Sequence, residues 1–308
     1  MSGHSHHEGA HHHGEVAHGR AFAWGVALNL LFVAVEAAYG WLGGSLALLA
    51  DAGHNLSDVV SLLLAWGAAA MAARPPSERR TYGLRKSTVL ASLFSALLLL
   101  VALGGIAWEA VRRFAHPQPV AGREVILVAA VGVVINTATA LLFLSGRKED
   151  LNVRGAFLHM AADAALSLGV VVAGAVMMAT GWLWVDPVVS LVIVAVVLVG
   201  TWPLLRDSLD LALDAVPREV DVAALRRYLE GVEGVARLHD LHVWPLSTTE
   251  VALSVHLVMA GAVGRDFLPA LQRSLREHFG IAHATIQLER VGDEPCLLDG
   301  GAGTQGGA

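Results

Sequence analysis

Cysteine, charged residues and basic clusters are all scarce in this chain of 308 residues. The one cysteine, Cys296, excludes a disulfide framework and a thiolate metal cluster, so any metal must be held by His and carboxylate. Charged residues make up 16 % of the chain, against about 25 % in an average soluble domain. With 55 % hydrophobic residues and a mean hydropathy of +0.57, a soluble globular protein is not expected.

The charge balance argues against a nucleic-acid partner. The chain has 21 Lys and Arg against 27 Asp and Glu, which gives a net charge of −6. No dense basic cluster accompanies aromatic side chains, as a nucleic-acid surface requires. We therefore expect no nucleic acid among its partners, whereas its fifteen His make a metal worth testing.

Long apolar stretches dominate the first two thirds of the chain. A bilayer core about 30 Å thick needs about 20 apolar residues per helical span. Six stretches satisfy this requirement, and we predict six transmembrane helices in membrane lipid. They are residues 21–42, 45–73, 87–108, 125–146, 153–180 and 187–205.

The distribution of Lys and Arg predicts the orientation of these spans, because cytoplasmic loops carry an excess of positive charge. The connections after the second and fourth spans hold eight basic residues: Arg74, Arg79, Arg80, Arg85, Lys86, Arg147, Lys148 and Arg154. The connections on the other side hold three: Arg112, Arg113 and Arg123. Both termini are therefore expected in the cytoplasm.

The periodicity changes from Asp207 onward. We predict a helix over 222–229, strands over 235–244 and 250–259, a helix over 266–279 and a strand over 284–291. This αββαβ order predicts a small α+β domain with two helices on one face of a three-stranded sheet. The fold class is thus an α-helical membrane protein followed by a cytoplasmic α+β domain.

The two ends of the chain differ in composition from the rest. We expect a His-rich cytoplasmic arm over 1–19, a transmembrane domain over 20–206, a cytoplasmic domain over 207–291 and a disordered tail over 292–308. An expression tag is one interpretation of the arm. Six consecutive His are absent, however, which favours a native metal-collecting segment.

Two predicted spans carry the same polar pattern, a His followed four residues later by an Asp. The pairs are His54 with Asp58 and His159 with Asp163. Residues at i and i+4 lie one above the other on one helix face, so each helix offers two ligands on one stripe. Ionisable residues inside a span are costly and are functional candidates by default.

Depth in the bilayer brings the two pairs to the same level. The second span runs inward from Ser45, which puts His54 about 13 Å and Asp58 about 20 Å below the outer edge. The fifth runs outward from Val153, which puts His159 about 9 Å and Asp163 about 15 Å above the inner edge. The resulting set of two imidazoles and two carboxylates suits tetrahedral Zn²⁺ or a similar divalent ion.

Other polar residues in the spans have alternative explanations. A single polar residue in a span is often hydrogen-bonded to a neighbouring helix, and this applies to Glu36, Asn29 and Asn136. Asp51, one turn before His54, is either a fifth ligand or a water-facing residue of a vestibule. Asp186 precedes a proline and is expected to be an N-cap at the outer surface.

These motifs resemble those of the cation diffusion facilitators, and most closely the bacterial zinc-efflux members. The resemblance rests on the six spans, the run LADAGHNLSD at 49–58, the second His and Asp pair, and the run HDLHVW at 239–244. It covers about residues 20–290. It implies a homodimeric antiporter of the bacterial cytoplasmic membrane that exports Zn²⁺ in exchange for protons, with a metallochaperone-like cytoplasmic domain.

The resemblance also implies a regulatory zinc site in the cytoplasmic domain. The ligands chosen on that basis are His239, His256, His283 and Glu289, with His242 as a weaker candidate. Alternation along the strand would put His239 and His242 on opposite faces. The alternative is that these are ordinary surface His. The loop between the second and third spans has no His, so we expect no metal site there.

Two other classes of function fit a membrane site of His and Asp. One is a membrane metalloenzyme, although catalytic zinc usually keeps three protein ligands and an open position for water. The other is a metal sensor whose soluble domain signals without transport. Measurement of metal flux separates both from a transporter.

Overall fold

The computed structural model describes residues 30–144 and 151–292. The predicted His-rich arm, Asn29, Cys296 and nearly all of the predicted tail lie outside these residues. The chain forms two compact units, the first from residues within 1–62 and 97–201 and the second from residues within 63–96 and 202–308. The two units are described separately below.

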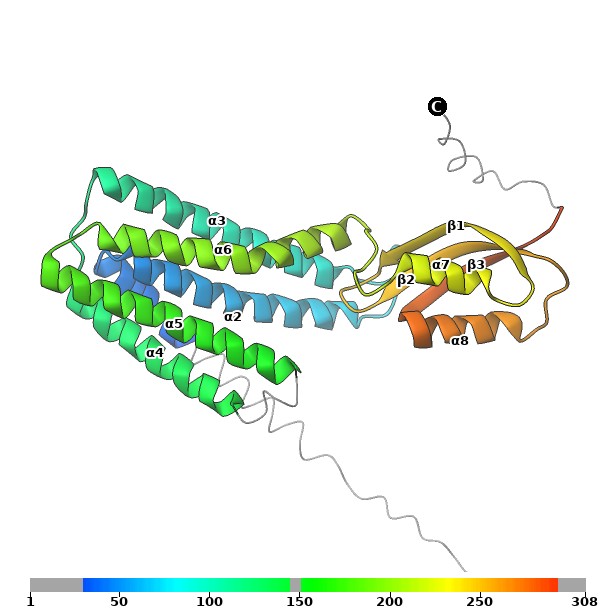
Figure 1. Cartoon of the computed structure of the whole chain (residues 1–308), viewed down its shortest axis with the longest axis horizontal. Coiled ribbons are helices and arrows are strands. Elements are labelled where there is room, and N and C mark those ends of the chain that lie inside the picture. Colours follow the sequence, from blue (N-terminus) through cyan, green and yellow to red (C-terminus); the bar gives the residue numbers. More distant parts are fainter. Residues whose placement is uncertain (1–29, 145–150, 293–308) are drawn as a thin grey trace, which may run out of the picture. The chain divides into compact units, whose positions relative to one another are not determined.

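Within the described residues, five helices are long and apolar enough to cross a membrane. They are α2 (Leu46–Ala72), α3 (Ser87–Ala115), α4 (Gly122–Phe143), α5 (Leu151–Thr180) and α6 (Val185–Ala212) (Figure 1). A shorter apolar helix, Leu30–Leu42, precedes them. The protein is therefore a multi-pass membrane protein.

Two helices extend beyond the apolar stretches that predicted them. Helix α3 continues from residue 108 to Ala115, and α6 continues from residue 205 to Ala212. A helix needs apolar side chains only inside the hydrocarbon, so hydropathy underestimates its length. Helix α6 ends where Asp214 adopts a left-handed conformation with φ 61° and the Ala215 amide donates to the Asp210 carbonyl at 2.9 Å.

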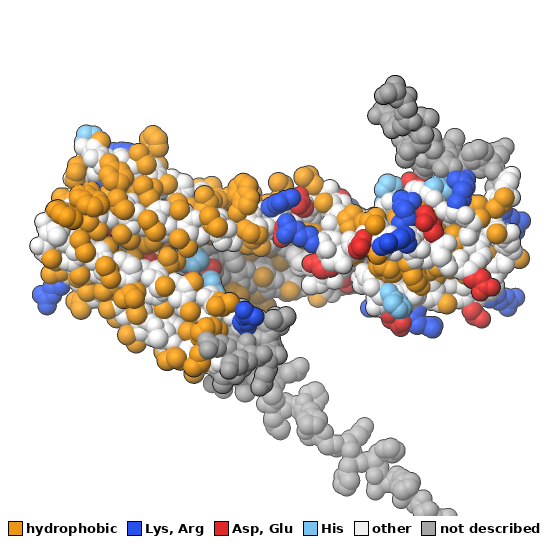
Figure 2. Space-filling model, viewed as in Figure 1, with side chains coloured by type: hydrophobic (Ala, Val, Ile, Leu, Met, Phe, Trp, Pro, Cys, Tyr) orange, Lys and Arg blue, Asp and Glu red, His pale blue; other side chains and the backbone are white. Residues whose placement is uncertain are grey.

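The helices of the first unit bury a narrow core and expose apolar side chains outward. Leu48 and Ile193 are 0 % and 2 % exposed at the centre of this core. Large apolar residues such as Leu142 and Val199 lie on the outside, and hydrophobic side chains cover the helices on the face shown in Figure 2. An apolar surface of this extent is expected of helices that contact lipid.

Helices α4 and α5 pack side by side through small residues. A Cβ atom on Gly174 of α5 would lie 2.6 Å from Ile126 Cγ1 of α4, and one on Gly122 of α4 would lie 2.8 Å from Met178 Cγ of α5. Such distances are too short for carbon atoms, so a larger residue at either position would force the facing side chain to move. This close packing fixes α5, which carries His159 and Asp163.

The beginning of α2 is held by a carboxylate from another helix. Asp186 of α6 accepts hydrogen bonds from Ser45 Oγ at 2.6 Å and from the backbone amides of Leu46 at 2.8 Å and Ala47 at 3.3 Å. Arg113 Nη1 lies 3.4 Å from the same carboxylate. Our prediction for Asp186 was wrong in one respect, because the residue lies inside α6 and caps α2 rather than its own helix.

The second unit contains a three-stranded sheet and two helices. Strands β1 (Val235–Pro245), β2 (Val251–Met259) and β3 (Ile281–Arg290) lie in the order β1-β2-β3. The β1 and β2 strands are antiparallel, whereas β2 and β3 are parallel, which requires the crossover helix between them. With α7 (Val222–Glu230) and α8 (Phe267–Phe279), the order is the predicted αββαβ.

Both helices cover the same face of the sheet. Their apolar stripes, which include Leu225 of α7 and Leu275 of α8, are fully buried against Val255 and Leu257 of β2. Because side chains alternate along a strand, His256 of β2 points to the other face. One face of the sheet therefore forms the core, and the other is left to carry polar side chains.

The connection between α2 and α3 contacts the sheet within this second unit. Arg85 Nη1 lies 2.8 Å from Glu250 Oε2, and the amide of Thr248 donates to Thr88 Oγ1 at 3.0 Å. Lys86 donates to the Pro245 carbonyl at 3.2 Å and also pairs with Asp214. Arg85 and Lys86 of this connection thus have specific acidic and carbonyl partners.

Candidate metal centres

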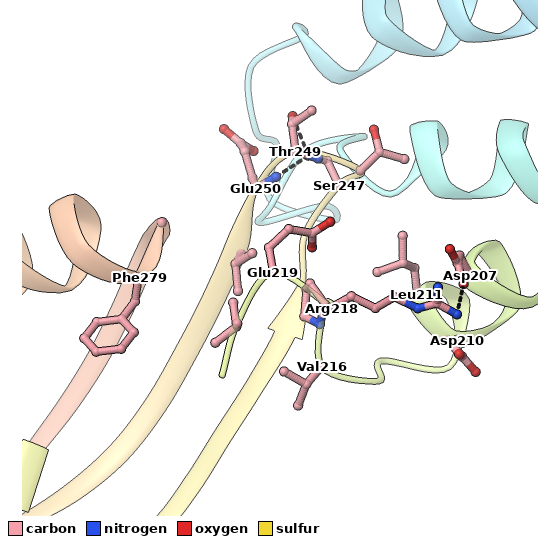
Figure 3. A pocket seen from close by; sticks show the side chains of 15 residues that line it. Asp207, Asp210, Leu211, Val216, Arg218, Glu219, Ser247, Thr249, Glu250 and Phe279 are labelled. Carbon is pink, nitrogen blue, oxygen red and sulfur yellow. Dashed lines mark hydrogen bonds and ion pairs between the residues drawn. The ribbon is translucent and has the colours of Figure 1, made fainter. Parts of the chain in front are cut away.

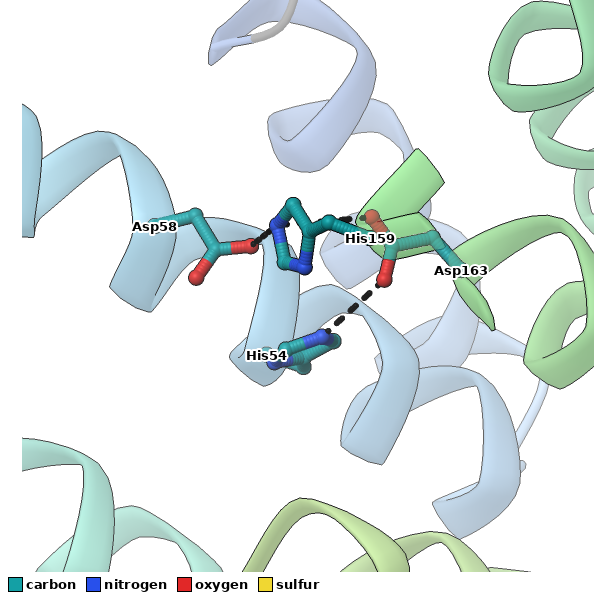
Figure 4. A group of neighbouring side chains, drawn as sticks. All are labelled: His54, Asp58, His159 and Asp163. Carbon is teal, nitrogen blue, oxygen red and sulfur yellow. Dashed lines mark hydrogen bonds and ion pairs between the residues drawn. The ribbon is translucent and has the colours of Figure 1, made fainter. Parts of the chain in front are cut away.

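Helices α2 and α5 bring four potential ligands together. His54 Nε2 lies 3.2 Å from Asp163 Oδ1, and His159 Nε2 lies 3.1 Å from Asp58 Oδ2 (Figure 4). His159 Nε2 is also 3.7 Å from Asp163 Oδ2. One ligand atom from each of the four residues lies within 4.8 Å of all the others. We call these four residues the membrane quartet.

The pairing within the membrane quartet is crosswise between the two helices. Each helix supplies a His and an Asp one turn apart, and each His lies against the Asp of the other helix. Equal depth in the bilayer predicts the same pairs, because the two helices run in opposite directions. The sequence spacing and the helix directions are therefore sufficient to explain why these side chains meet.

The geometry of the membrane quartet suits a tetrahedral divalent ion. Ligand atoms about 2.0–2.1 Å from a tetrahedral zinc ion lie roughly 3.3 Å from one another. The three contacts of 3.1 to 3.7 Å fall near that value. Two imidazoles and two carboxylates are a donor set that zinc accepts, and together they can close its coordination shell.

Exposure differs strongly across the membrane quartet. The side chain of Asp163 is 2 % exposed and that of His54 is 14 % exposed, whereas those of Asp58 and His159 are 34 % and 46 % exposed. An ion can therefore reach the quartet from the side of Asp58 and His159, with Asp163 at its buried end.

Asp51 and Glu36 lie outside the membrane quartet. Asp51 is fully buried and accepts a hydrogen bond from Ser167 Oγ at 2.7 Å, so the prediction of a water-facing vestibule residue was wrong. It is also absent from the four-ligand group. Glu36 accepts a hydrogen bond from Asn55 Nδ2 at 3.1 Å, which is the contact between helices that we expected. Asn136 Nδ2, by contrast, is buried without a partner among the described residues.

A second cluster lies on the helix-free face of the cytoplasmic sheet. His239 Nε2 is 2.9 Å from Glu289 Oε2, and His256 Nδ1 is 2.9 Å from Glu289 Oε1. His239 and His256 are direct partners across β1 and β2, and Glu289 comes from β3. The hydrogen bond from His239 lowers the pKa of Glu289, so its carboxylate is ionised at neutral pH. Two imidazoles and a carboxylate fit a borderline divalent ion such as zinc.

A bulge in β1 decides where His242 lies. The strand register shifts between His239 and His242, and Asp240 has a φ of 51°. The bulge pairs His242 with Ser254, two residues from His256 on β2, so His239 and His242 share a face. Our prediction of opposite faces was therefore wrong. His242 Nε2 nevertheless contacts Asp240 Oδ1 at 2.9 Å and is not part of the three-ligand group.

The structure does not bring His283 to this cluster. His283 pairs with Ala252, four residues from His256 on β2, which corresponds to about 13 Å along the strand. Its ring instead packs edge-on against Tyr82, with 5.5 Å between the ring centroids. The family resemblance assigned His283 as a ligand, and strand register separates it from the other three.

A cavity of about 440 Å³ lies elsewhere in the second unit (Figure 3). It is lined by the end of α6, the segment that follows it, the turn between β1 and β2, and Phe279. Arg218 forms an ion pair with Asp207 in its wall. None of the residues predicted as ligands lines this cavity, so it is separate from both His clusters.

Comparison with protein families also divides the chain into a transmembrane part and a cytoplasmic part. Residues 23–211 match the cation efflux transmembrane domain, and residues 217–291 match the cytoplasmic domain of cation efflux proteins. The two matches follow one another along the chain, so both units have counterparts in the same group of proteins.

Several bacterial proteins are similar over nearly the whole chain. The metal cation efflux system protein CzcD of Cupriavidus metallidurans is 37 % identical over 298 residues, which are 96 % of this chain and 91 % of that protein. The zinc transporter ZitB of Escherichia coli is 36 % identical over 95 % of this chain and 93 % of its own length. A cadmium, cobalt and zinc/H⁺-K⁺ antiporter of Bacillus subtilis is 33 % identical over 91 % of each chain.

Proposed function

Because this chain belongs to the cation efflux family and is a metal cation transporter rather than an enzyme, we propose that it exports Zn²⁺ in exchange for protons. The observation that carries this proposal is the membrane quartet. It consists of two His and two Asp that meet between two apolar helices. Ionisable side chains are costly in such helices and usually mark a functional site. The names of the similar transporters from Escherichia coli and Bacillus subtilis point to the same cargo.

Exchange of metal for protons follows from the chemistry of the four ligands. Zinc requires neutral imidazole and ionised carboxylate, so metal binding releases protons from these groups. Protons that arrive from the outer side compete for the same atoms and displace the metal there, since imidazole titrates near physiological pH. Rocking of α2 and α5 would expose the quartet alternately to the two sides, as in other transporters with a binding site in the membrane.

The arrangement in the membrane is part of the proposal. We infer six spans in the bacterial cytoplasmic membrane with both termini in the cytoplasm, the first span containing Leu30–Leu42. Support comes from the excess of basic residues in the two connections assigned to the cytoplasm. The proposed division is an arm over 1–19, a transmembrane domain over 20–206, a cytoplasmic domain over 207–291 and a tail over 292–308.

The cytoplasmic cluster supports a regulatory role for zinc. We infer that His239, His256 and Glu289 bind a zinc ion that stabilises this domain within a homodimer. The three ligands come from three strands, so a bound ion would link β1, β2 and β3 on the face that the helices leave uncovered. His242 and His283 are not included in this set.

Zinc flux into inverted membrane vesicles tests the function. Vesicles with the wild-type protein and an acidic interior are expected to accumulate zinc, and Asp58→Ala or Asp163→Ala should abolish the accumulation because each removes a charged ligand from a closed shell. Asp210→Ala is the matched control, since Asp210 is a half-exposed carboxylate paired only with Arg206 at 3.9 Å among the described residues. Near-wild-type flux in either ligand variant would refute the site, and no flux in the wild type would favour a sensor.

A further inference from the structure

Two buried carboxyl groups in the first unit have no role in the membrane quartet. Glu36 lies on the helix Leu30–Leu42 and Asp51 lies on α2, and both are 0 % exposed. No hydrogen bond or ion pair among the described residues joins either of them to the four ligands. Two acidic groups buried among apolar helices are costly unless each is neutralised or paired.

Each carboxyl group has one oxygen with a neutral donor and one oxygen without any. Asn55 Nδ2 donates to Glu36 Oε2, and Ser167 Oγ donates to Asp51 Oδ2. Glu36 Oε1 and Asp51 Oδ1 are buried and receive no hydrogen bond from any donor in the described part of the chain. Glu36 bonds to Asn55, which is one helical turn after Asp51 on α2, so the two carboxyl groups lie against the same side of that helix. Two ionised carboxylates cannot occupy such positions, because they repel and neither supplies a hydrogen atom.

The number of free oxygen atoms decides which cation fits between them. A hard metal ion takes about six to eight oxygen ligands, and the two carboxyl groups offer only two side-chain oxygen atoms without a hydrogen bond from the described residues. A proton needs one donor oxygen and one acceptor oxygen. We propose that Glu36 and Asp51 share one proton, and that this pair is a proton-binding site of the antiporter separate from the four metal ligands.

The surroundings of the pair link it to the metal by charge. Asp51 is one helical turn before His54 on α2, and Ser167, which donates to Asp51, is one turn after Asp163 on α5. The titratable groups that act on Asp51 include His54, Asp163 and Glu36. A divalent ion on the membrane quartet favours two negative charges on the neighbouring pair. Metal binding therefore releases the shared proton, and rebinding of the proton favours metal release.

This inference rests on the proposed zinc and proton exchange, and proton counting tests it. The full-length protein in detergent is titrated with zinc in weakly buffered solution, and the protons released per bound zinc are measured. In Glu36→Gln the amide keeps the shape of a protonated carboxyl group and can still donate to Asp51, but it has no proton to release. We expect unchanged zinc stoichiometry and a loss of about one proton per zinc ion. Glu109→Gln, which removes a part-exposed carboxylate of α3, should release as many protons as the wild type.

The titration tests the shared proton and the zinc and proton exchange separately. An unchanged proton count in Glu36→Gln would overturn the inference and leave the pair as a permanent hydrogen bond, while proton release by the wild type would still support the exchange. Zinc binding without proton release in the wild type would refute the exchange itself. If Glu36→Gln does not fold, Asp51→Asn gives the same measurement. If neither folds, infrared difference spectra of the wild type should show loss of a protonated carboxyl band on zinc binding, and its absence would overturn the inference.

Discussion

Replacement of Asp186 by Ala should destabilise the helical unit strongly. The buried carboxylate accepts hydrogen bonds from Ser45 Oγ and from the amides of Leu46 and Ala47, and it faces Arg113. Its removal leaves the first amides of α2 without these acceptors and takes from Arg113 its buried partner, so that only the part-exposed Glu109 at 3.6 Å still pairs with that charge. Breaking one side of a buried ion pair costs about 3–5 kcal/mol. This range exceeds the typical effect of a point mutation, which is about 1 kcal/mol.

The loss of unfolding free energy in Asp186→Ala is limited by what remains around Arg113. The side chain of Arg113 is 13 % exposed and also donates to the Gly44 carbonyl, so part of its charge is compensated after the substitution. Adding the energies of the separate hydrogen bonds would therefore overestimate the free energy lost in Asp186→Ala. In Asp186→Asn one oxygen can still accept from Ser45 or a backbone amide, and we expect a loss of about 1–3 kcal/mol, similar to that of one buried unsatisfied group.

Reversible unfolding in mixed micelles, followed by tryptophan fluorescence, measures this free energy. Asp210→Ala is the control, because its contact with Arg206 is exposed and worth about 0–1 kcal/mol. Zinc affinity should fall together with stability, since Asp186 fixes the beginning of the helix that carries His54. A free energy of unfolding within about 0.5 kcal/mol of the wild type for Asp186→Ala would refute the assignment of this carboxylate as the cap of α2.

Three further predictions concern metal. His54→Asp should retain transport but change the ratio of zinc to cadmium flux, because a harder oxygen donor replaces an imidazole; an unchanged ratio would show that His54 does not bind the ion. Substitution of both His239 and His256 by Ala should remove the zinc bound by the cytoplasmic cluster and lower, without abolishing, flux in the full-length protein. Calorimetry that finds unchanged zinc stoichiometry would contradict it. Deletion of Met1–Gly19 should weaken zinc affinity a few-fold, as measured by the zinc dependence of flux, and complete loss of flux by an inserted protein would argue against a merely collecting role.

Sequence patterns were sufficient to predict the features that depend on a single structural repeat. The spacing of His54 and Asp58, repeated in His159 and Asp163, follows directly from the helical repeat, and depth in the bilayer gives their pairing. The order of helices and strands in the cytoplasmic domain likewise follows from its hydrophobic periodicity. These features depend on local geometry and on the thickness of the bilayer, both of which are known before the structure is.

Other features depend on contacts between distant segments and could not be predicted in this way. The bulge at Asp240 reverses the direction of His242, and no glycine marks that position in the sequence. Strand register, which depends on the start of β3 at Ile281, separates His283 from Glu289 and its partners. The partner of Asp186 lies 140 residues away at Leu46, and the hydrogen bond from Asn55 to Glu36 likewise requires the packing of two helices.

The bulge at Asp240 also bears on aggregation. Strand β1 is an edge of the described sheet and, with 11 residues, is long enough to recruit a strand from another chain. An exposed edge strand of this length promotes aggregation unless the regular spacing of its amide and carbonyl groups is interrupted. Register shifts at two points along β1, one of them at the bulge, interrupt the regular row of amides and carbonyls. The irregularity that orients the His side chains thus also hinders uncontrolled extension of the sheet at its β1 edge.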